Sequence, residues 1–177
     1  MNATHLLEGQ YSAIYSELSA LRAAAPKALI KVIFETSRLN PDQIIAACVL
    51  ASASSLDYVK TSTGFLAADD CIKGPNGERK PTGATKEDVQ LMKACCEYLG
   101  SDAGAVGGSQ KKKMKVKASG GVRTLTDAVI MTQAGAERLG SSGGVWIAKE
   151  GEAAKAGKGG MDGERPKGME TRMFSDY

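Results

Sequence analysis

The sequence predicts an α/β domain with a parallel sheet, either an open doubly wound sheet or part of a (β/α)8 barrel. Helix-like and strand-like segments alternate over about the first 150 residues, which is typical of βαβ units. The glycine fingerprint that binds dinucleotides after a first strand is absent, which argues against the doubly wound sheet. Central strands carry lysines at 31, 60, 115 and 117. Because a barrel interior can hold polar layers near its catalytic end, these lysines favour the barrel.

The first half of the chain contains two predicted helix–strand pairs. Apolar residues at helical spacing predict a helix over residues 6–24. The apolar, β-rich run ALIKVIFE at 28–35 predicts a buried strand. Asn40 followed by Pro41 is typical of a helix start, with asparagine as the cap and proline in the first turn. Residues 56–61 then form the next predicted strand.

Two polar connections interrupt the second half. Residues 66–81 are polar and rich in glycine and proline, so we expect a surface insertion or a lid there. Thr85 with Asp88 predicts a capped helix after it. Residues 100–112 form a second long connection, rich in glycine and lysine. Both connections should lie in loops of the domain.

The remaining elements complete the predicted alternation. Residues 114–118 should form a strand, and Thr124 should cap a helix that runs to about residue 134. A short strand at 136–139 and a helix at 145–149 follow. We therefore expect a partial barrel domain over 1–150. Residues 151–177 are rich in glycine and charge, and we expect a flexible tail there.

Composition limits the possible functions. With 42% hydrophobic and 24% charged residues, the chain has the composition of a soluble globular protein. A net charge of +3 is too small to indicate a nucleic-acid partner, and no apolar run is long enough to indicate a membrane partner. The four cysteines lack metal-ligand spacing, so we expect reduced thiols and no metal. No signal peptide is evident, and we expect a cytoplasmic location.

Two lysines at strand ends indicate amine chemistry. Side chains alternate across a strand, so apolar Val59 and Val116 should face the helices while Lys60 and Lys117 face the barrel interior. An amine that is buried beside another cation is pushed toward its neutral form, which attacks carbonyl groups to give Schiff bases. The alternative is a structural lysine paired with an inward carboxylate such as Glu35.

Glycine-containing turns follow the last two predicted strands. They contain Gly120, Gly121, Gly140, Ser141 and Ser142, and each turn enters a helix. Free backbone N–H groups at such turns can hold a phosphate, and barrels commonly bind phosphate after their last two strands. The alternative is a pair of ordinary turns with helix caps.

Four segments resemble one enzyme family. They are DYVKTSTGF at 57–65, GATKEDVQLM at 83–92, VKASGGVRTLTDA at 116–128 and AERLGSSGGV at 136–145, and together they resemble deoxyribose-phosphate aldolase. KVIFET at 31–36 also fits. The resemblance implies a class I aldolase with a TIM barrel and no cofactor. Its reaction would be the reversible cleavage of 2-deoxy-D-ribose 5-phosphate to D-glyceraldehyde 3-phosphate and acetaldehyde.

The same resemblance implies roles for individual residues. Lys60 corresponds to the Schiff-base lysine, and Lys117 corresponds to the second lysine that perturbs it. Tyr177 could correspond to the C-terminal tyrosine that some members use in proton transfer. The other implied binding residues are Thr61, Thr63, Gly120, Gly121, Ser141 and Ser142.

The resemblance covers only the last four strands of an eight-stranded barrel. It places the first half, including the proton-relay aspartate of the fourth strand, before Met1. Half a barrel has open sheet edges, so we expect it to self-associate or to pair with an N-terminal half-barrel. Two alternative functions remain open. One is a catalytically inactive half-barrel that binds phosphate, and the other is a lysine aldolase with a related carbonyl substrate.

Overall fold

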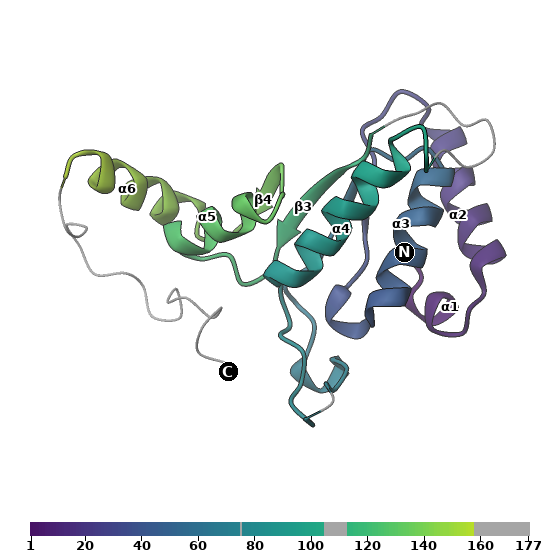
Figure 1. The fold of residues 1–177 in the computed structure, drawn as a ribbon, viewed down its shortest axis with the longest axis horizontal. Coiled ribbons are helices and arrows are strands. Elements are labelled where there is room, and N and C mark those ends of the chain that lie inside the picture. Colours follow the sequence, from purple (N-terminus) through teal and green to yellow (C-terminus); the bar gives the residue numbers. More distant parts are fainter. Residues whose placement is uncertain (75, 105–112, 158–177) are drawn as a thin grey trace.

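A computed structural model describes residues 1–74, 76–104 and 113–157 of the 177-residue chain (Figure 1). Helices and strands alternate along these residues. In chain order the elements are α1 (Ala3–Leu7), α2 (Tyr11–Ala24), β1 (Lys31–Ile33), the 3-10 helix η1 (Thr36–Arg38), α3 (Pro41–Ala53), β2 (Tyr58–Lys60), the 3-10 helix η2 (Ala68–Asp70), α4 (Lys86–Leu99), β3 (Lys115–Ser119), α5 (Leu125–Gln133), β4 (Arg138–Gly140) and α6 (Gly144–Lys155).

The strands form one parallel sheet in the order β1-β2-β3-β4. Each pair of neighbours is joined by a helix, namely α3, α4 or α5, so the chain repeats the βαβ unit three times. The predicted α/β class and the four parallel strands are confirmed. Val32, Val59 and Val116 lie side by side in the register, and Lys60 lies beside Lys117.

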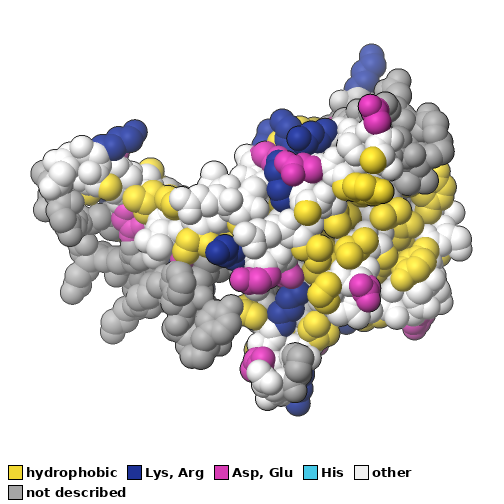
Figure 2. All heavy atoms as spheres, in the orientation of Figure 1, with side chains coloured by type: hydrophobic (Ala, Val, Ile, Leu, Met, Phe, Trp, Pro, Cys, Tyr) yellow, Lys and Arg dark blue, Asp and Glu magenta, His cyan; other side chains and the backbone are white. Residues whose placement is uncertain are grey.

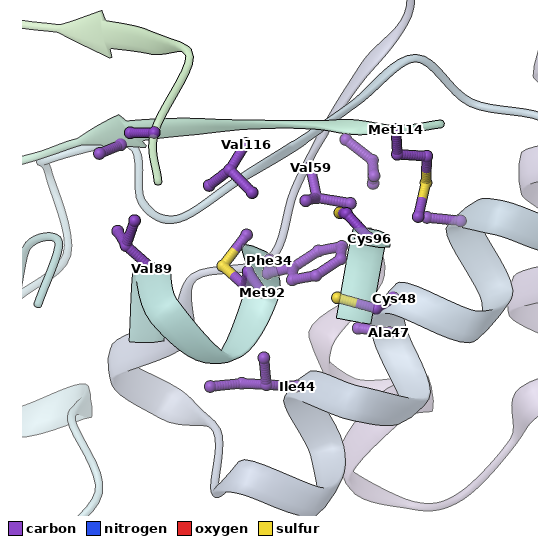
Figure 3. Close-up of a cluster of buried hydrophobic side chains, with 14 of the residues drawn as sticks. Phe34, Ile44, Ala47, Cys48, Val59, Val89, Met92, Cys96, Met114 and Val116 are labelled. Carbon is purple, nitrogen blue, oxygen red and sulfur yellow. The ribbon is translucent and has the colours of Figure 1, made fainter. Parts of the chain in front are cut away.

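The hydrophobic core fills the space between the sheet and helices α3 and α4. Figure 3 shows Phe34, Val59 and Val116 directed toward Ile44 of α3 and Met92 of α4. All five side chains are buried, so the prediction that Val59 and Val116 face the helices is confirmed. Because side chains alternate along a strand, this packing directs Lys60 and Lys117 to the opposite face of the sheet.

The opposite face of the sheet is cationic. It presents Lys31, Tyr58 and Lys115 in one row of the register, and Lys60, Lys117 and Arg138 in another row. Lys31 Nζ and Arg138 Cζ lie 5.6 Å and 4.9 Å from the centroid of the Tyr58 ring, close enough for cation–π attraction. Any group that covers this face must therefore accommodate several positive charges.

The C-terminal elements extend from the main body. In Figure 1, β4, α5 and α6 reach away from the part of the molecule formed by α1 to α4. Hydrophobic side chains are spread over the surface of that main part (Figure 2). Tyr11, Tyr15 and Leu21 of α2 are each about half exposed. None of the helices in the described ranges is long and apolar enough to span a membrane.

Two predictions about helices need correction. The single helix expected over residues 6–24 is wrong, because Gly9 adopts a φ of +71° and separates α1 from α2. The last helix continues to Lys155, past the expected boundary at residue 150. The start of the predicted tail is therefore helical, whereas residues 158–177 lie outside the described part of the chain.

The described residues of the insertion, 66–74 and 76–81, have defined structure. Lys73 and Arg79 form an antiparallel bridge, and Arg79 also pairs with Asp69 at 2.9 Å. Lys80 anchors its end, because its Nζ donates to the carbonyl oxygens of Thr36 and Leu39 and to Asp88 Oδ1 at 2.7 Å. Of the second insertion, the structure describes residues 100–104 alone.

Candidate active site

Lys60 lies at the carboxyl end of β2, with its side chain partly exposed on the cationic face. The preceding Val59 is fully buried against the helices, and the alternation of the strand turns Lys60 to the other side. The Phe34 N–H donates to the Lys60 carbonyl at 2.9 Å. The backbone is therefore held by the neighbouring strand while the amine remains accessible.

Lys117 is the neighbour of Lys60 on β3. Their Cα atoms are partners in the register, and adjacent strands lie about 4.8 Å apart. The Lys117 side chain passes over Gly140 of β4, where an added Cβ would lie 2.9 Å from Lys117 Cε and 3.4 Å from Nζ. The absence of a side chain at Gly140 therefore gives Lys117 its space. The structure brings together the two lysines that the sequence singled out.

The environment of Lys60 lowers the pKa of its amine. Burial lowers the pKa of Lys60 below its usual range, the positive charge of Lys117 lowers it further, and the negative charge of Glu35 opposes both effects. Within the described residues, no carboxylate lies within 4.0 Å of either lysine. The alternative of a lysine that is ion-paired with Glu35 is therefore not what the structure shows.

The positions expected to bind phosphate lie in two neighbouring loops. Gly120 and Gly121 have φ angles of +88° and +79°, which glycine adopts without strain. The Ser141 hydroxyl donates to the Val122 carbonyl and accepts from the Gly143 N–H at 2.8 Å. Ser141 thus ties the end of β4 to the loop after β3.

The two threonines near Lys60 have different surroundings. The Thr61 hydroxyl donates to the Ser119 carbonyl and accepts from the Ser119 N–H, both at 2.9 Å, and the side chain is fully buried. This geometry makes Thr61 a link between β2 and β3, without a free hydroxyl for a substrate. Thr63 is exposed, and its N–H donates to Glu35 Oε1 at 2.9 Å.

Comparison with known proteins identifies relatives of this chain. A deoxyribose-phosphate aldolase from Coccidioides immitis is 46% identical over 150 residues, which are 85% of this chain and 47% of that protein. One from Rhodospirillum rubrum is 40% identical over 88% of this chain and 54% of its own length. This chain is a relative of the deoxyribose-phosphate aldolases. It spans about half the length of the curated relatives it matches.

Solved aldolase structures share the fold. A crystal structure from C. immitis described as a deoxyribose-phosphate aldolase matches with a TM-score of 0.69 and 44% identity, over 86% of this chain and 50% of that one. The tetrameric deoxyribose phosphate aldolase of Aeropyrum pernix matches with a TM-score of 0.60 and 28% identity, over 82% of this chain and 50% of that one. No protein-family model matches the chain.

One pocket of this aldolase relative lies outside the pair formed by Lys60 and Lys117. It has a volume of about 590 Å³ between α4 and α5, and its lining includes Gly64, Gly83, Gly121 and Arg123. Neither Lys60 nor Lys117 lines this pocket. The pocket therefore reaches the glycine-rich loop from the face of the sheet that the helices cover. Lys60 and Lys117 lie on the cationic face of the sheet. We therefore assign the amine chemistry to this face and not to the pocket.

Tyr177 and possible metal ligands are the remaining features that the sequence analysis considered. Tyr177 lies outside the described residues. Among the residues that the structure does describe, no group of three or more histidine, cysteine or acidic side chains could hold a metal ion. The described part of the predicted site therefore consists of Lys60, Lys117 and the loops after β3 and β4.

Replacing Lys117 with Met should raise the pKa of Lys60, because it removes one of the two influences that lower this pKa. Less of the Lys60 amine is then neutral near pH 7. We expect imine formation with acetaldehyde to become slower near pH 7, and its pH profile to move to higher pH. Borohydride trapping across a pH series measures both effects, and an unchanged profile would contradict the role of Lys117.

Replacing Gly140 with Ala should displace Lys117. The added Cβ would lie 2.6 Å from Ser119 Cβ and 2.9 Å from Lys117 Cε, so we expect a loss of about 1–3 kcal/mol in the free energy of unfolding together with weaker imine trapping. Gly144→Ala is the matched control, since nothing lies within 4 Å of an added Cβ there. Urea unfolding compares the two variants, and equal stabilities would contradict the predicted clash.

Proposed function

We propose that the protein is a class I aldolase that reversibly cleaves 2-deoxy-D-ribose 5-phosphate to D-glyceraldehyde 3-phosphate and acetaldehyde. The observation that supports this most directly is the pairing of Lys60 with Lys117 across β2 and β3, with a lowered pKa at Lys60. It occurs in a chain that is 46% identical to a deoxyribose-phosphate aldolase over its matched region. Such a reaction belongs to deoxyribonucleotide and carbohydrate catabolism in the cytoplasm.

The proposed chemistry begins at Lys60. Its neutral amine attacks the aldehyde carbon of the open-chain sugar, and loss of water gives an iminium ion. Removal of the proton from the C3 hydroxyl breaks the C2–C3 bond, releases D-glyceraldehyde 3-phosphate and leaves the bonding electrons in an enamine. Protonation at C2 and addition of water then release acetaldehyde and the free amine. Lys117 acts by keeping Lys60 neutral between turnovers.

Proton transfer needs an acid–base group in addition to the two lysines. The described residues place no carboxylate within 4.0 Å of either amine. We propose that a carboxylate on the group that covers the cationic face fills this role. A tyrosine at the C-terminus, Tyr177, is a second candidate for a proton-transfer role.

The substrate phosphate is proposed to bind at the loops after β3 and β4. Gly120 and Gly121 lie in one loop, and Gly140, Ser141 and the exposed Ser142 lie where β4 leads into α6. Backbone N–H groups in glycine turns and at a helix start attract phosphate oxygens. Thr63 lies at the exposed turn after Lys60 and could contact the substrate, whereas Thr61 supports the strand pairing.

We propose that a partner covers the cationic face of the sheet. Because it carries several lysines and Arg138, a second copy placed face to face would bring like charges together. An N-terminal half-barrel that supplies carboxylates is the better proposed cover. Homo-oligomers can use other surfaces, such as the half-exposed Tyr11 and Tyr15, and the Aeropyrum pernix relative is a tetramer.

A second candidate function is phosphate binding without turnover. The observation that favours it is the length of the match, since the chain spans about half of its curated relatives. In that case the glycine loops would bind phosphate without cleavage of the sugar.

Release of acetaldehyde from 2-deoxy-D-ribose 5-phosphate tests the proposed function, measured through reduction by alcohol dehydrogenase and NADH. The proposal predicts NADH consumption that requires Lys60. Sugar-phosphate binding without acetaldehyde release, in folded protein, would instead support the second candidate. Trapping with pyruvate in place of acetaldehyde would indicate an aldolase with a different donor.

A further inference from the structure

Glu35 follows β1 and interrupts the regular pairing of β1 with β2. The Phe34 N–H donates to the Lys60 carbonyl at 2.9 Å, and the Thr36 N–H donates to the Thr61 carbonyl at 3.1 Å. The two donors are two residues apart, but their acceptors are only one residue apart. In a regular parallel ladder, successive donors and successive acceptors are both two residues apart. Glu35 is therefore the extra residue of a β-bulge, a feature that re-aims a side chain.

The backbone of Glu35 is strained. Its φ of 57° and ψ of 62° lie in the left-handed region, which costs a residue other than glycine about 1–2 kcal/mol. Such conformations persist where the surrounding structure holds them, often at functional sites. Here the bulge brings the Glu35 carboxylate to the turn after Lys60, where Oε1 accepts the Thr63 N–H at 2.9 Å.

The second carboxylate oxygen of Glu35 is buried and has no hydrogen-bond partner among the described residues. The carboxylate is also not within 4.0 Å of the Lys60 amine, yet its charge opposes the lowering of the Lys60 pKa. Glu35 thus acts on Lys60 through space and holds the adjacent turn by contact.

We propose that Glu35 is a positioning residue for Lys60, which fixes the turn at Thr63 and places a negative charge near the reactive amine. The inference rests on the proposed function, because Lys60 is taken as the amine that forms the imine. Lys117 favours the neutral amine, and Glu35 opposes it. The opposing charges of Lys117 and Glu35 would together set the pH range in which Lys60 reacts.

Two variants separate the contact from the charge. Glu35→Gln keeps an oxygen that can accept the Thr63 N–H but removes the charge, whereas Glu35→Ala removes both. Brief acetylation of the full chain with acetic anhydride across a pH series, followed by peptide mapping, reports how much of each lysine is neutral. Exposed Lys115 serves as the internal reference, and Glu78→Gln, at an exposed carboxylate, is the matched control.

The proposal predicts that Glu35→Gln moves the acetylation profile of Lys60 to lower pH, while Glu78→Gln leaves it unchanged. Glu35→Ala should show the same movement, and its yield of borohydride-trapped acetaldehyde adduct should also fall on the order of tenfold, because the turn is no longer held. A Lys60 profile that is the same in wild type and Glu35→Gln would overturn the proposal.

The two proposals can fail separately. Acetylation reports the protonation of Lys60 whether or not an imine forms. A wild-type chain without an acetaldehyde adduct would therefore reject the proposed function, while the Glu35→Gln profile would still decide the role of Glu35.

Discussion

Lys60→Ala is expected to abolish formation of the acetaldehyde adduct in the full chain. The reason is that Lys60 combines accessibility on the open face with a pKa lowered by burial and by Lys117, and only the neutral amine is a nucleophile. Intact-mass measurement after treatment with acetaldehyde and borohydride gives the yield. We expect a decrease of about a hundredfold or more, to the background of ordinary surface lysines.

Lys115→Ala is the matched control for Lys60→Ala. Lys115 lies on β3 two residues from Lys117, but its side chain is exposed, so its removal should leave the adduct yield close to that of wild type. Equal yields in wild type and Lys60→Ala, with both proteins folded, would show that the reactive amine is elsewhere.

Lys80→Ala is expected to cause the largest loss of stability among single changes in the insertion. The Lys80 ammonium joins Asp88 Oδ1 at 2.7 Å and two carbonyl oxygens of residues 36 and 39, and the Asp88 side chain is only 7% exposed. Removing Lys80 leaves a buried carboxylate without its cation. We expect the free energy of unfolding to fall by about 3 kcal/mol, since breaking one partner of a buried pair typically costs this much.

Urea denaturation followed by circular dichroism measures this loss. Lys86→Ala is the control, because Lys86 is an exposed residue in the first turn of α4 and its removal should change stability by less than about 0.5 kcal/mol. If Lys80→Ala were as stable as Lys86→Ala, the insertion would not depend on the Lys80–Asp88 pair.

The main features of the sheet could be predicted because they follow from local patterns. Alternation of apolar and charged residues placed Val59 and Val116 against the helices and put Lys60 and Lys117 on the other face, as the structure shows. The break between α1 and α2 also has a local cause, since Gly9 provides a positive φ. That signal was present in the sequence but was outweighed by the helical spacing of the apolar residues.

Other features depend on contacts between distant residues and have no local signal. The bulge at Glu35 requires a positive φ at a residue other than glycine, and it is held by Thr63, which is 28 residues away. The Thr61 hydroxyl was expected beside the substrate, yet it pairs with Ser119 at a separation of 58 residues. Neither partner can be identified before the strands are placed side by side.

The central claim is that Lys60 forms the imine with the sugar substrate. The most direct measurement is to incubate the wild-type chain with 2-deoxy-D-ribose 5-phosphate, reduce with borohydride and locate the added mass by peptide mapping, with excess inorganic phosphate as a competitor. The account predicts an adduct on Lys60 that phosphate suppresses. An adduct spread over exposed lysines, or none on Lys60 in folded protein, would contradict it.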